Sequence, residues 1–471
     1  MDRRLFLKST SGLLSLASAA PLPALASVAP LPALASGVND VVIIGAGLSG
    51  LNAAVTLQDM GLKPLVLEAN DRVGGRVFTK HGDDWSVEVG GQEIGAMYSY
   101  TLSAVERFGL AKQEADIGID GFSFIVGDKL YSKKDFMAAY GASFKDNERP
   151  FAPSRLKGAY YPAGLSTNNH IWSSPELASY DVSLAAYMKQ AGASDAAMKF
   201  VGNPNARPPE KISLLWEARQ KAFSSLNSGK KYFQLLDGMD ALPKAMAGAL
   251  GDRLLLGKKA TVVRQSAGAG VEVICEDGGV YRAGAVILAV PLTVMRKMKI
   301  ETELSPEKRK AIDEMNYGQG TCVYFRARRA YWEEDGLPAS MWTDGELGKI
   351  YKWRSAVGEY LWNYITGPVE TMMRGKSDSE LFRFIMDKLA AARPSMEGAL
   401  EPLFRHSWST SPYALGTFHY WGPGQAGFDD AFRQPEGKIV FAGEHTMSVE
   451  MGLEAAMASG VQAAFEATDL L

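Results

Sequence analysis

The chain has 471 residues and a mass of 50.9 kDa, which is enough for two or three domains of roughly 100 to 200 residues. Its residues are 46% hydrophobic and 22% charged, a composition typical of globular proteins rather than of disordered or multi-span membrane proteins. The 50 lysines and arginines against 53 aspartates and glutamates leave a net charge of −3, too balanced for a nucleic-acid-binding surface. The only two cysteines, Cys275 and Cys322, cannot build a disulfide framework or a cysteine-based metal cluster.

Residues 1–36 have the layout of an export signal peptide. Arg3 and Arg4 precede Phe-Leu-Lys and a long apolar stretch without acidic residues, and prolines interrupt this stretch too often for a membrane-spanning helix. The segment resembles a twin-arginine export signal, although Asp2 stands where that signal usually has Ser or Thr. Cleavage after Ala26 and cleavage after Ala35 are equally compatible with the sequence. We expect the twin-arginine machinery to export a folded, cofactor-loaded protein, which is then periplasmic or secreted.

The residues that follow predict a dinucleotide-binding strand, turn and helix. The apolar run 40–44 leads into Gly45-Ala-Gly47-Leu-Ser-Gly50 and then into a helical pattern. A second apolar run, 64–67, ends at Glu68, 18 residues beyond Gly50, close to the spacing expected for an acid that binds a ribose hydroxyl. The cofactor-binding residues predicted here are Gly45, Gly47, Leu48, Ser49, Gly50, Glu68 and Ala69.

Two further segments favour FAD over a nicotinamide cofactor. Residues 72–79 contain a glycine doublet followed by Arg76, and they resemble a segment of the FAD-dependent amine oxidases in which backbone amides and an arginine extend the pyrophosphate site. Residues 437–446 form a second strand-like run before another helix start. A carboxylate here can accept hydrogen bonds from hydroxyl groups, and a helix N-terminus can stabilise negative charge on the flavin ring. These segments add Gly75, Arg76, Gly443, Glu444, Gly452 and Leu453 to the predicted cofactor site.

Together with residues 235–247 and 285–292, these motifs resemble the flavin-containing amine oxidase family, which includes monoamine, polyamine and L-amino acid oxidases. The resemblance runs in order from about Val41 to Ala464. It implies an α/β fold with a Rossmann-type FAD-binding domain assembled from residues 38–95, 231–297 and 425–471. It also implies an α+β substrate-binding domain from residues 96–230 and 298–424. Apolar spacing over 175–228 predicts that this second domain has a helical subregion.

The resemblance also implies roles for individual residues. Lys299 lies in a segment similar to the one whose lysine holds a water against flavin N5, so we expect it to be catalytic. Val263 stands where the family contacts adenine through its backbone. Trp408 opens an aromatic segment that forms one wall of the substrate pocket in the family.

Three departures from the family pattern narrow the expected substrate. Thr417 stands where monoamine oxidases have a flavin-linked cysteine, so FAD is expected to be non-covalent. Phe418 and Leu453 replace the aromatic pair that encloses the amine in that branch. Glu93 stands where the venom type of L-amino acid oxidase has a carboxylate-binding arginine, which favours a cationic substrate. Tyr364, in contrast, matches a tyrosine that assists carboxylate binding in those amino acid oxidases.

We therefore expect an FAD-dependent oxidoreductase that acts on a small-molecule amine, with O2 or a periplasmic electron carrier as the electron acceptor. An L-amino acid oxidase, and an amine dehydrogenase that uses a periplasmic electron carrier, are the alternatives. A non-enzymatic FAD-binding protein is the remaining reading. The five histidines lack HxxxH and HExxH spacings, so no metal site is predicted. A homodimer is among the assemblies that the sequence allows.

Overall fold

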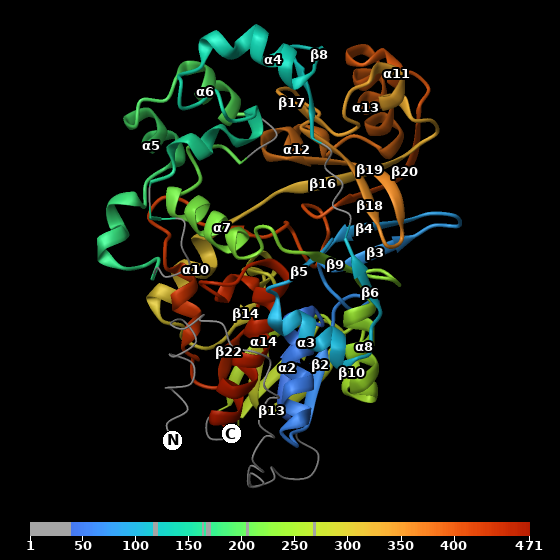
Figure 1. Ribbon diagram of the computed structural model, residues 1–471. Helices are drawn as coiled ribbons and strands as arrows, with labels where there is room; N and C mark the ends of the chain where they lie inside the picture. Colours follow the sequence, from blue (N-terminus) through green and yellow to red (C-terminus); the bar gives the residue numbers. More distant parts are fainter. Residues whose placement is uncertain (1–38, 116–120, 163, 166–170, 204–206, 267–269) are drawn as a thin grey trace.

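The computed structural model describes residues 39–115, 121–162, 164–165, 171–203, 207–266 and 270–471. It has a lower lobe around an eight-stranded sheet and an upper lobe around a seven-stranded sheet, with short helices to one side of the upper lobe (Figure 1). The predicted export signal lies outside the described residues. No helix in the described ranges is long and apolar enough to cross a membrane.

The eight-stranded sheet is built from three separate stretches of the chain. Its central strand β1 runs parallel to β2 and β13, and alternate β1 residues enter two different cores: Val41 and Ile43 on one face, Val42 and Ile44 on the other. Burial on both faces explains the continuous apolar run in the sequence. The strands, in chain order, are β1 (Asn39–Ile44), β2 (Pro64–Leu67), β10 (Leu254–Leu255), β11 (Ala260–Ser266), β12 (Gly270–Cys275), β13 (Val280–Leu288), β14 (Lys299–Ile300) and β22 (Ile439–Phe441).

Helices cover both faces of this sheet. The first core is closed by α2 (Leu48–Asp59), α3 (Ser99–Arg107), α8 (Ala241–Leu250) and α14 (Gly452–Asp469). The second core contains residues of α9 (Leu292–Met295), α10 (Pro306–Glu314) and η6 (Phe428–Arg433). Helix α14 approaches α2 so closely that a Cβ at Gly460 would lie 2.4 Å from the Ser49 carbonyl oxygen. The last helix of the chain is thereby fixed beside the first, with the third turn of α14 against the start of α2.

The seven-stranded sheet forms the centre of the upper lobe. Its strand order is β20-β16-β19-β18-β17-β7-β8. One row of paired residues crosses five of these strands and shares one face of the sheet: His406, Cys322, Tyr364, Lys349 and Trp342. The strands are β7 (Ser123–Val126), β8 (Lys129–Tyr131), β16 (Gly320–Ala327), β17 (Met341–Thr343), β18 (Lys349–Ser355), β19 (Gly358–Thr366) and β20 (Leu400–Ser407).

Short helices between residues 133 and 226 make up the side of the upper lobe seen at the upper left of Figure 1. Serines cap four of them, because the side chains of Ser132, Ser183, Ser194 and Ser213 each accept a backbone N–H of the first turn. The helices are α4 (Lys133–Tyr140), η2 (Pro153–Tyr160), η3 (Pro175–Tyr180), α5 (Leu184–Gln190), α6 (Asp195–Val201) and α7 (Leu214–Leu226). The predicted helical subregion is present.

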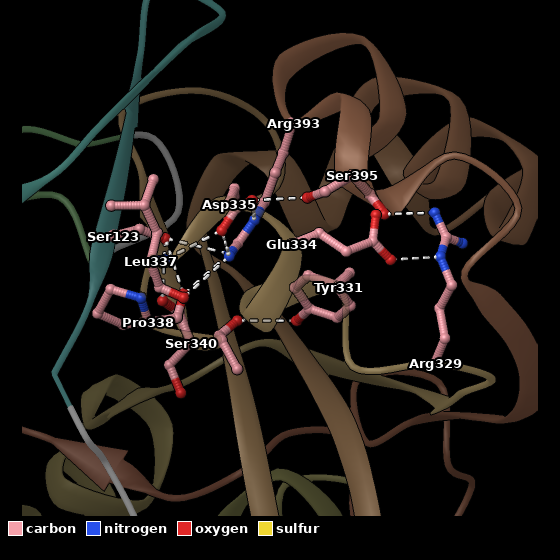
Figure 2. Close-up of polar contacts among 11 residues, drawn as sticks. Ser123, Arg329, Tyr331, Glu334, Asp335, Leu337, Pro338, Ser340, Arg393 and Ser395 are labelled. Atoms are coloured by element: carbon pink, nitrogen blue, oxygen red, sulfur yellow. Dashed lines mark hydrogen bonds and ion pairs between the residues drawn. The ribbon is translucent and has the colours of Figure 1, made fainter.

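A buried arginine ties the far edge of the seven-stranded sheet to its helices. Arg393 follows α13 (Asp378–Ala392), is fully buried, and binds Asp335 through two hydrogen bonds of 2.7 and 2.8 Å. It also donates to the carbonyl oxygens of Leu337 and Pro338 (Figure 2). Asp335, at the end of α11 (Tyr331–Asp335), accepts a further hydrogen bond from Ser395. The Arg393–Asp335 clasp therefore connects two helix ends and the loop before β17.

Three small sheets join the lobes, and one of them places functional residues: β15 (Asn316–Tyr317) pairs with β21 (His419–Tyr420), which sets Tyr317 opposite His419. The other two small sheets comprise β3 (Phe78–His81), β4 (Ser86–Gly90), β5 (Ile94–Gly95), β6 (Lys112–Glu114) and β9 (Tyr232–Leu235).

The predicted α/β fold class is confirmed. The predicted domain limits remain a prediction, with one correction: β14 pairs with β11 in the eight-stranded sheet, whereas residue 298 had been predicted to start the substrate-binding domain.

Candidate active site

Two glycine segments meet at the carboxyl end of β1. Gly47 and Gly74 form an isolated parallel bridge, and the Gly74 N–H donates to the Ala46 carbonyl at 2.8 Å. A Cβ at Gly45 would lie 2.6 Å from the Ala289 carbonyl oxygen, and one at Gly50 would lie 2.0 Å from the Gly45 carbonyl oxygen. A Cβ at Gly47 would meet nothing within 4 Å. The first and third glycines are thus required by the fold, whereas the middle one leaves open space.

This open space faces the start of a helix. Gly47 is the N-cap of α2, and no side chain caps the helix. Its first N–H groups and the positive end of its dipole are suited to bind a phosphate. Leu48 and Ser49, the first two residues of α2, are buried. The turn and helix start therefore fit the pyrophosphate of a dinucleotide.

Glu68 stabilises the glycine turn from the end of β2. Its carboxylate accepts a hydrogen bond from the N–H group of Ala46 in the turn (2.7 Å). It accepts another from the N–H group of Asn70, the residue after Ala69 (2.8 Å). Burial raises the pKa of Glu68 despite these hydrogen bonds. The carboxylate lies beside the turn, as a ribose-binding acid must, and its contact with a ribose stays a prediction.

The C-terminal segment brings a second helix start to the same region. Gly452, with φ of 60°, begins α14, whose N-cap Met451 provides no side-chain hydrogen bond. A Cβ at Gly452 would meet nothing within 4 Å. Leu453 packs against Gly91, and the Gly443 N–H donates to the Ser459 hydroxyl at 3.0 Å. A second uncapped helix N-terminus is therefore available to an electron-rich group of a ligand.

Glu444 is the centre of a buried network of polar side chains. Its carboxylate accepts hydrogen bonds from Arg76 (3.0 Å) and the Tyr317 hydroxyl (3.1 Å), and it binds His419 Nδ1. Arg76 also donates to the Thr417 carbonyl oxygen at 2.7 Å. Burial alone would raise the pKa of Glu444, but His419 and Arg76 hold it well below its usual range. The residue is therefore a permanent carboxylate.

Several buried ring nitrogens beside Glu444 have no partner among the described residues. These are Nε2 of His419 and both ring nitrogens of His445. Burial lowers the pKa of His419, so its ring is neutral near pH 7; Nδ1 carries the proton toward Glu444, and Nε2 is left as an acceptor. Burial also lowers the pKa of His445 to about 3. A ligand with hydroxyl groups would satisfy such acceptors.

These observations fit FAD. Gly47, Gly75, Arg76 and the start of α2 would hold its pyrophosphate, Glu68 its ribose, and the Glu444 network and the start of α14 the remainder. When bound, FAD supplies a site that accepts a hydride equivalent from a carbon next to nitrogen.

A cavity of about 740 Å³ adjoins this network. Tyr317 and Thr417 line one end of it, and Tyr364, Lys349 and Trp342 line it from the sheet. Residues of the helical side, from Pro153 to Glu217, line the opposite wall. Since Tyr317 both contacts Glu444 and lines the cavity, the cavity opens at the predicted flavin site.

Positive charge predominates on the cavity wall. Arg207 lies with its guanidinium carbon 4.5 Å from the ring centre of Phe418 and 5.2 Å from that of Tyr420. Tyr364 lines the same cavity; burial raises its pKa, and the positive charge of Arg207 opposes that rise. The one acidic side chain lining this cavity in the described part of the chain, Glu217, is paired with Lys157.

The structure gives no support to the predicted catalytic role of Lys299. Lys299 lies on β14 at the edge of the nucleotide-binding sheet, its side chain is 69% exposed, and it forms an ion pair with Glu301 at 2.5 Å. It does not line the cavity. Val263 lies between β12 and β14, and its carbonyl accepts the Glu301 N–H, so its predicted contact with adenine finds no support here.

The predicted pocket residues lie at different distances from the cavity. Tyr364 lines it, and Phe418 packs under Arg207 beside it. Trp408 is instead buried against the β4 strand, where its Nε1 donates to the Val89 carbonyl at 3.3 Å. Glu93 is half-buried outside the cavity lining, with one buried carboxylate oxygen lacking a partner among the described residues and a pKa raised to about 7 by burial.

The sequence did not identify Arg207, Lys349 or Tyr317 as site residues. Arg207 precedes two prolines in a stretch without a motif. Lys349 begins a strand whose sequence shows only the usual alternation of polar and apolar residues. Tyr317 reaches the site through the β15–β21 pairing of segments about 100 residues apart. No local pattern signals such residues, because only the packing of the lobes brings them together.

Comparisons with known proteins agree with this geometry. The family model described as flavin containing amine oxidoreductase matches residues 48–467. An L-amino-acid oxidase of Siganus canaliculatus is 26% identical over 451 residues, 90% of this chain and 84% of that protein. A flavin-containing amine oxidase of Danio rerio is 26% identical over 453 residues, 91% of this chain and 85% of that protein.

Solved structures give the same fold. Cyclohexylamine oxidase from Brevibacterium oxydans has a TM-score of 0.73 at 24% identity, and putrescine oxidase bound to putrescine has a TM-score of 0.72 at 22% identity. Each comparison covers 92% of this chain and 99% of the other. With the glycine cradle, the Glu444 network and a family match spanning nearly the whole described chain, this protein belongs to the flavin-containing amine oxidoreductase family.

Proposed function

We propose that the protein is an L-amino acid oxidase that holds FAD non-covalently. The observation that carries the proposal is Arg207, a guanidinium that lines the same cavity as Tyr364 and, like Thr417, lies close to Gly318. A guanidinium and a phenol are suited to bind a carboxylate. A substrate carboxylate bound there would place its α-carbon at the end of the cavity that adjoins the Glu444 network.

The proposed reaction breaks the α-carbon–hydrogen bond of an amino acid and removes two electrons, giving an imine. Water then converts the imine to a 2-oxo acid and ammonia, and transfer of the two electrons to O2 gives hydrogen peroxide. The protein's contribution is to bind the carboxylate and to surround the amine with buried groups, which favours the neutral amine that can be oxidised.

A cationic amine substrate, with no carboxylate, is the second candidate. It is favoured by Glu93, a half-buried side chain in the segment that follows β4, with one buried carboxylate oxygen that has no partner among the described residues. The sequence alone favoured this candidate. We place it second because Glu93 is not among the cavity-lining residues, whereas Arg207, Lys211 and Lys349 are.

The test is to load the purified protein with FAD and mix it anaerobically with L-amino acids and with the amines that their decarboxylation would give. We expect the visible flavin band to be lost with amino acids. Arg207→Met should lower kcat/KM for amino acids by about 10- to 100-fold, since a charge-assisted hydrogen bond contributes about 1.5–3 kcal/mol. The exposed Arg309 on α10, outside the cavity lining, provides the control variant Arg309→Met. Loss of the flavin band with amines alone would refute the proposal.

Admitting air to the reduced protein then distinguishes an oxidase from a dehydrogenase that needs a periplasmic carrier.

Non-covalent binding of FAD is supported by Thr417, which stands at the position of the linking cysteine. It predicts that acid precipitation releases the flavin into the supernatant. Export is proposed from the twin-arginine-like segment, and replacing Arg3 and Arg4 by lysine should retain the protein in the cytoplasm.

A further inference from the structure

The cavity carries more positive charge than one carboxylate requires. Its charged lining residues are Lys157, Arg207, Lys211, Lys349 and Glu217, so four cations face one anion, a net charge of 4 − 1 = +3. Glu217 is engaged by Lys157 and by the Tyr161 hydroxyl at 3.0 Å. After this pairing, Arg207, Lys211 and Lys349 remain for a ligand.

Lys349 is the most confined of these three cations. It begins β18, directly opposite Trp342 on one neighbouring strand and Tyr364 on the other, and all three side chains line the cavity. No residue in the described part of the chain forms a hydrogen bond or an ion pair with its ammonium group. A half-buried ammonium between two aromatic residues is costly unless something anionic binds it.

The surroundings of Lys349 increase this cost. Burial, together with the charges of Lys157, Arg155 and Arg207, lowers its pKa to about 8, and only Glu217 opposes this shift. Like charges placed close together beside aromatic side chains do not contribute to the stability of the fold. An anionic ligand in the cavity would relieve both the desolvation and the mutual repulsion.

We propose that the preferred substrates are acidic amino acids, with the α-carboxylate bound by Arg207 and Tyr364 and the side-chain carboxylate bound by Lys349. The inference rests on the proposed amino acid oxidase function and names its substrate class. Lys211, which is exposed, lies at the cavity rim and adds to the attraction of a dianion. The paired anion Glu217 keeps Lys157 from competing for the same carboxylate.

The matched substrates L-glutamate and L-glutamine test this inference, because they differ by one charge at nearly constant shape. With the FAD-loaded protein, we expect kcat/KM to be at least about tenfold higher for glutamate, because only its side chain offers Lys349 a charge-assisted hydrogen bond. Lys349→Met should lower the glutamate value by about tenfold or more, mainly through KM, and change the glutamine value far less. Lys349→Arg should retain the preference, and Lys134→Met, on the exposed face of α4, serves as the control.

Binding of non-oxidisable acids provides a readout that does not depend on turnover. Glutarate should bind the FAD-loaded protein more tightly than butyrate, measured by calorimetry, and Lys349→Met should abolish the difference. Equal oxidation of glutamate and glutamine, with glutarate and butyrate bound alike, would overturn the acidic substrate class and leave the amino acid oxidase proposal standing. Failure of every L-amino acid to reduce the flavin, with amines active, would overturn both.

Discussion

Lys349 and Tyr364 face each other across β18 and β19, and both side chains line the cavity that adjoins the flavin site. A lysine and a tyrosine paired in this way put a cation beside a hydrogen-bonding hydroxyl on the sheet floor. A slip of one residue in either strand would turn the side chain of that strand to the opposite face of the sheet. The substrate-binding properties of this protein therefore depend on strand register.

The cost of burying Lys349 can be measured as stability. Its folded-state pKa of about 8 lies below the ordinary value of 10.5, so in this interval the unfolded chain binds more protons and stability rises with pH. Lys349→Met should raise the free energy of unfolding at pH 7 by about 1–3 kcal/mol, and this gain should shrink at pH 9.5. Denaturant titrations at both pH values, with Lys134→Met alongside, check this. A variant less stable than the parent at pH 7 would contradict it.

The glycine turn offers a pair of variants with opposite expectations. Gly47→Ala should fold, because its Cβ would meet nothing within 4 Å, but it should weaken FAD binding by about 10- to 100-fold through steric conflict with the pyrophosphate. Gly50→Ala should prevent correct folding, because its Cβ would lie 2.0 Å from the Gly45 carbonyl oxygen. Circular dichroism and flavin fluorescence titration separate the two effects. Normal FAD affinity of Gly47→Ala would argue against the cradle.

Removing the charge of Glu444 should weaken cofactor binding. Glu444→Gln loses the charge-assisted hydrogen bonds to Arg76 and His419, each worth about 1.5–3 kcal/mol, and the dissociation constant of FAD should rise by about 10- to 100-fold. The measurement is flavin release on dilution. Glu106→Gln, on the exposed surface of α3, is the control and should bind FAD as the parent does.

The Arg393–Asp335 clasp should stabilise the upper lobe far more than a neighbouring surface pair does. Arg393→Met leaves Asp335 without its partner and should cost about 3–5 kcal/mol. Arg329→Met removes the exposed ion pair with Glu334, also seen in Figure 2, and should cost at most about 1 kcal/mol. Denaturation midpoints of the two variants would be compared. Equal losses would show that burial of the clasp contributes nothing.

Lys299 should prove dispensable for catalysis. Because its side chain is exposed and paired with Glu301, Lys299→Met should change kcat by no more than about twofold, as is usual for a surface substitution. Rapid-mixing measurements of flavin reduction would test this directly. A large loss in this variant would restore the role that the resemblance suggested.

The sequence alone predicted those parts of the protein whose function is carried by local backbone. The turn from Gly45 to Gly50, the acid at Glu68 and the second glycine segment are short-range patterns, because a tight turn, a phosphate cradle and a helix start each need particular residues at fixed spacing. The apolar run of β1 likewise reports burial on both faces of a parallel sheet. Fold class, family and cofactor followed from these patterns.

Only the tertiary structure decided which side chains face the substrate. Arg207 comes from the helical side, Lys349 and Tyr364 from the seven-stranded sheet, and Tyr317 from a strand that pairs with β21. Each lies in a segment whose local sequence is ordinary, and their meeting depends on long-range strand pairing and on how the two lobes pack. The position of Lys299, which local resemblance selected, was likewise decided by the tertiary structure: it lies on an edge strand of the other sheet, which turns it to solvent.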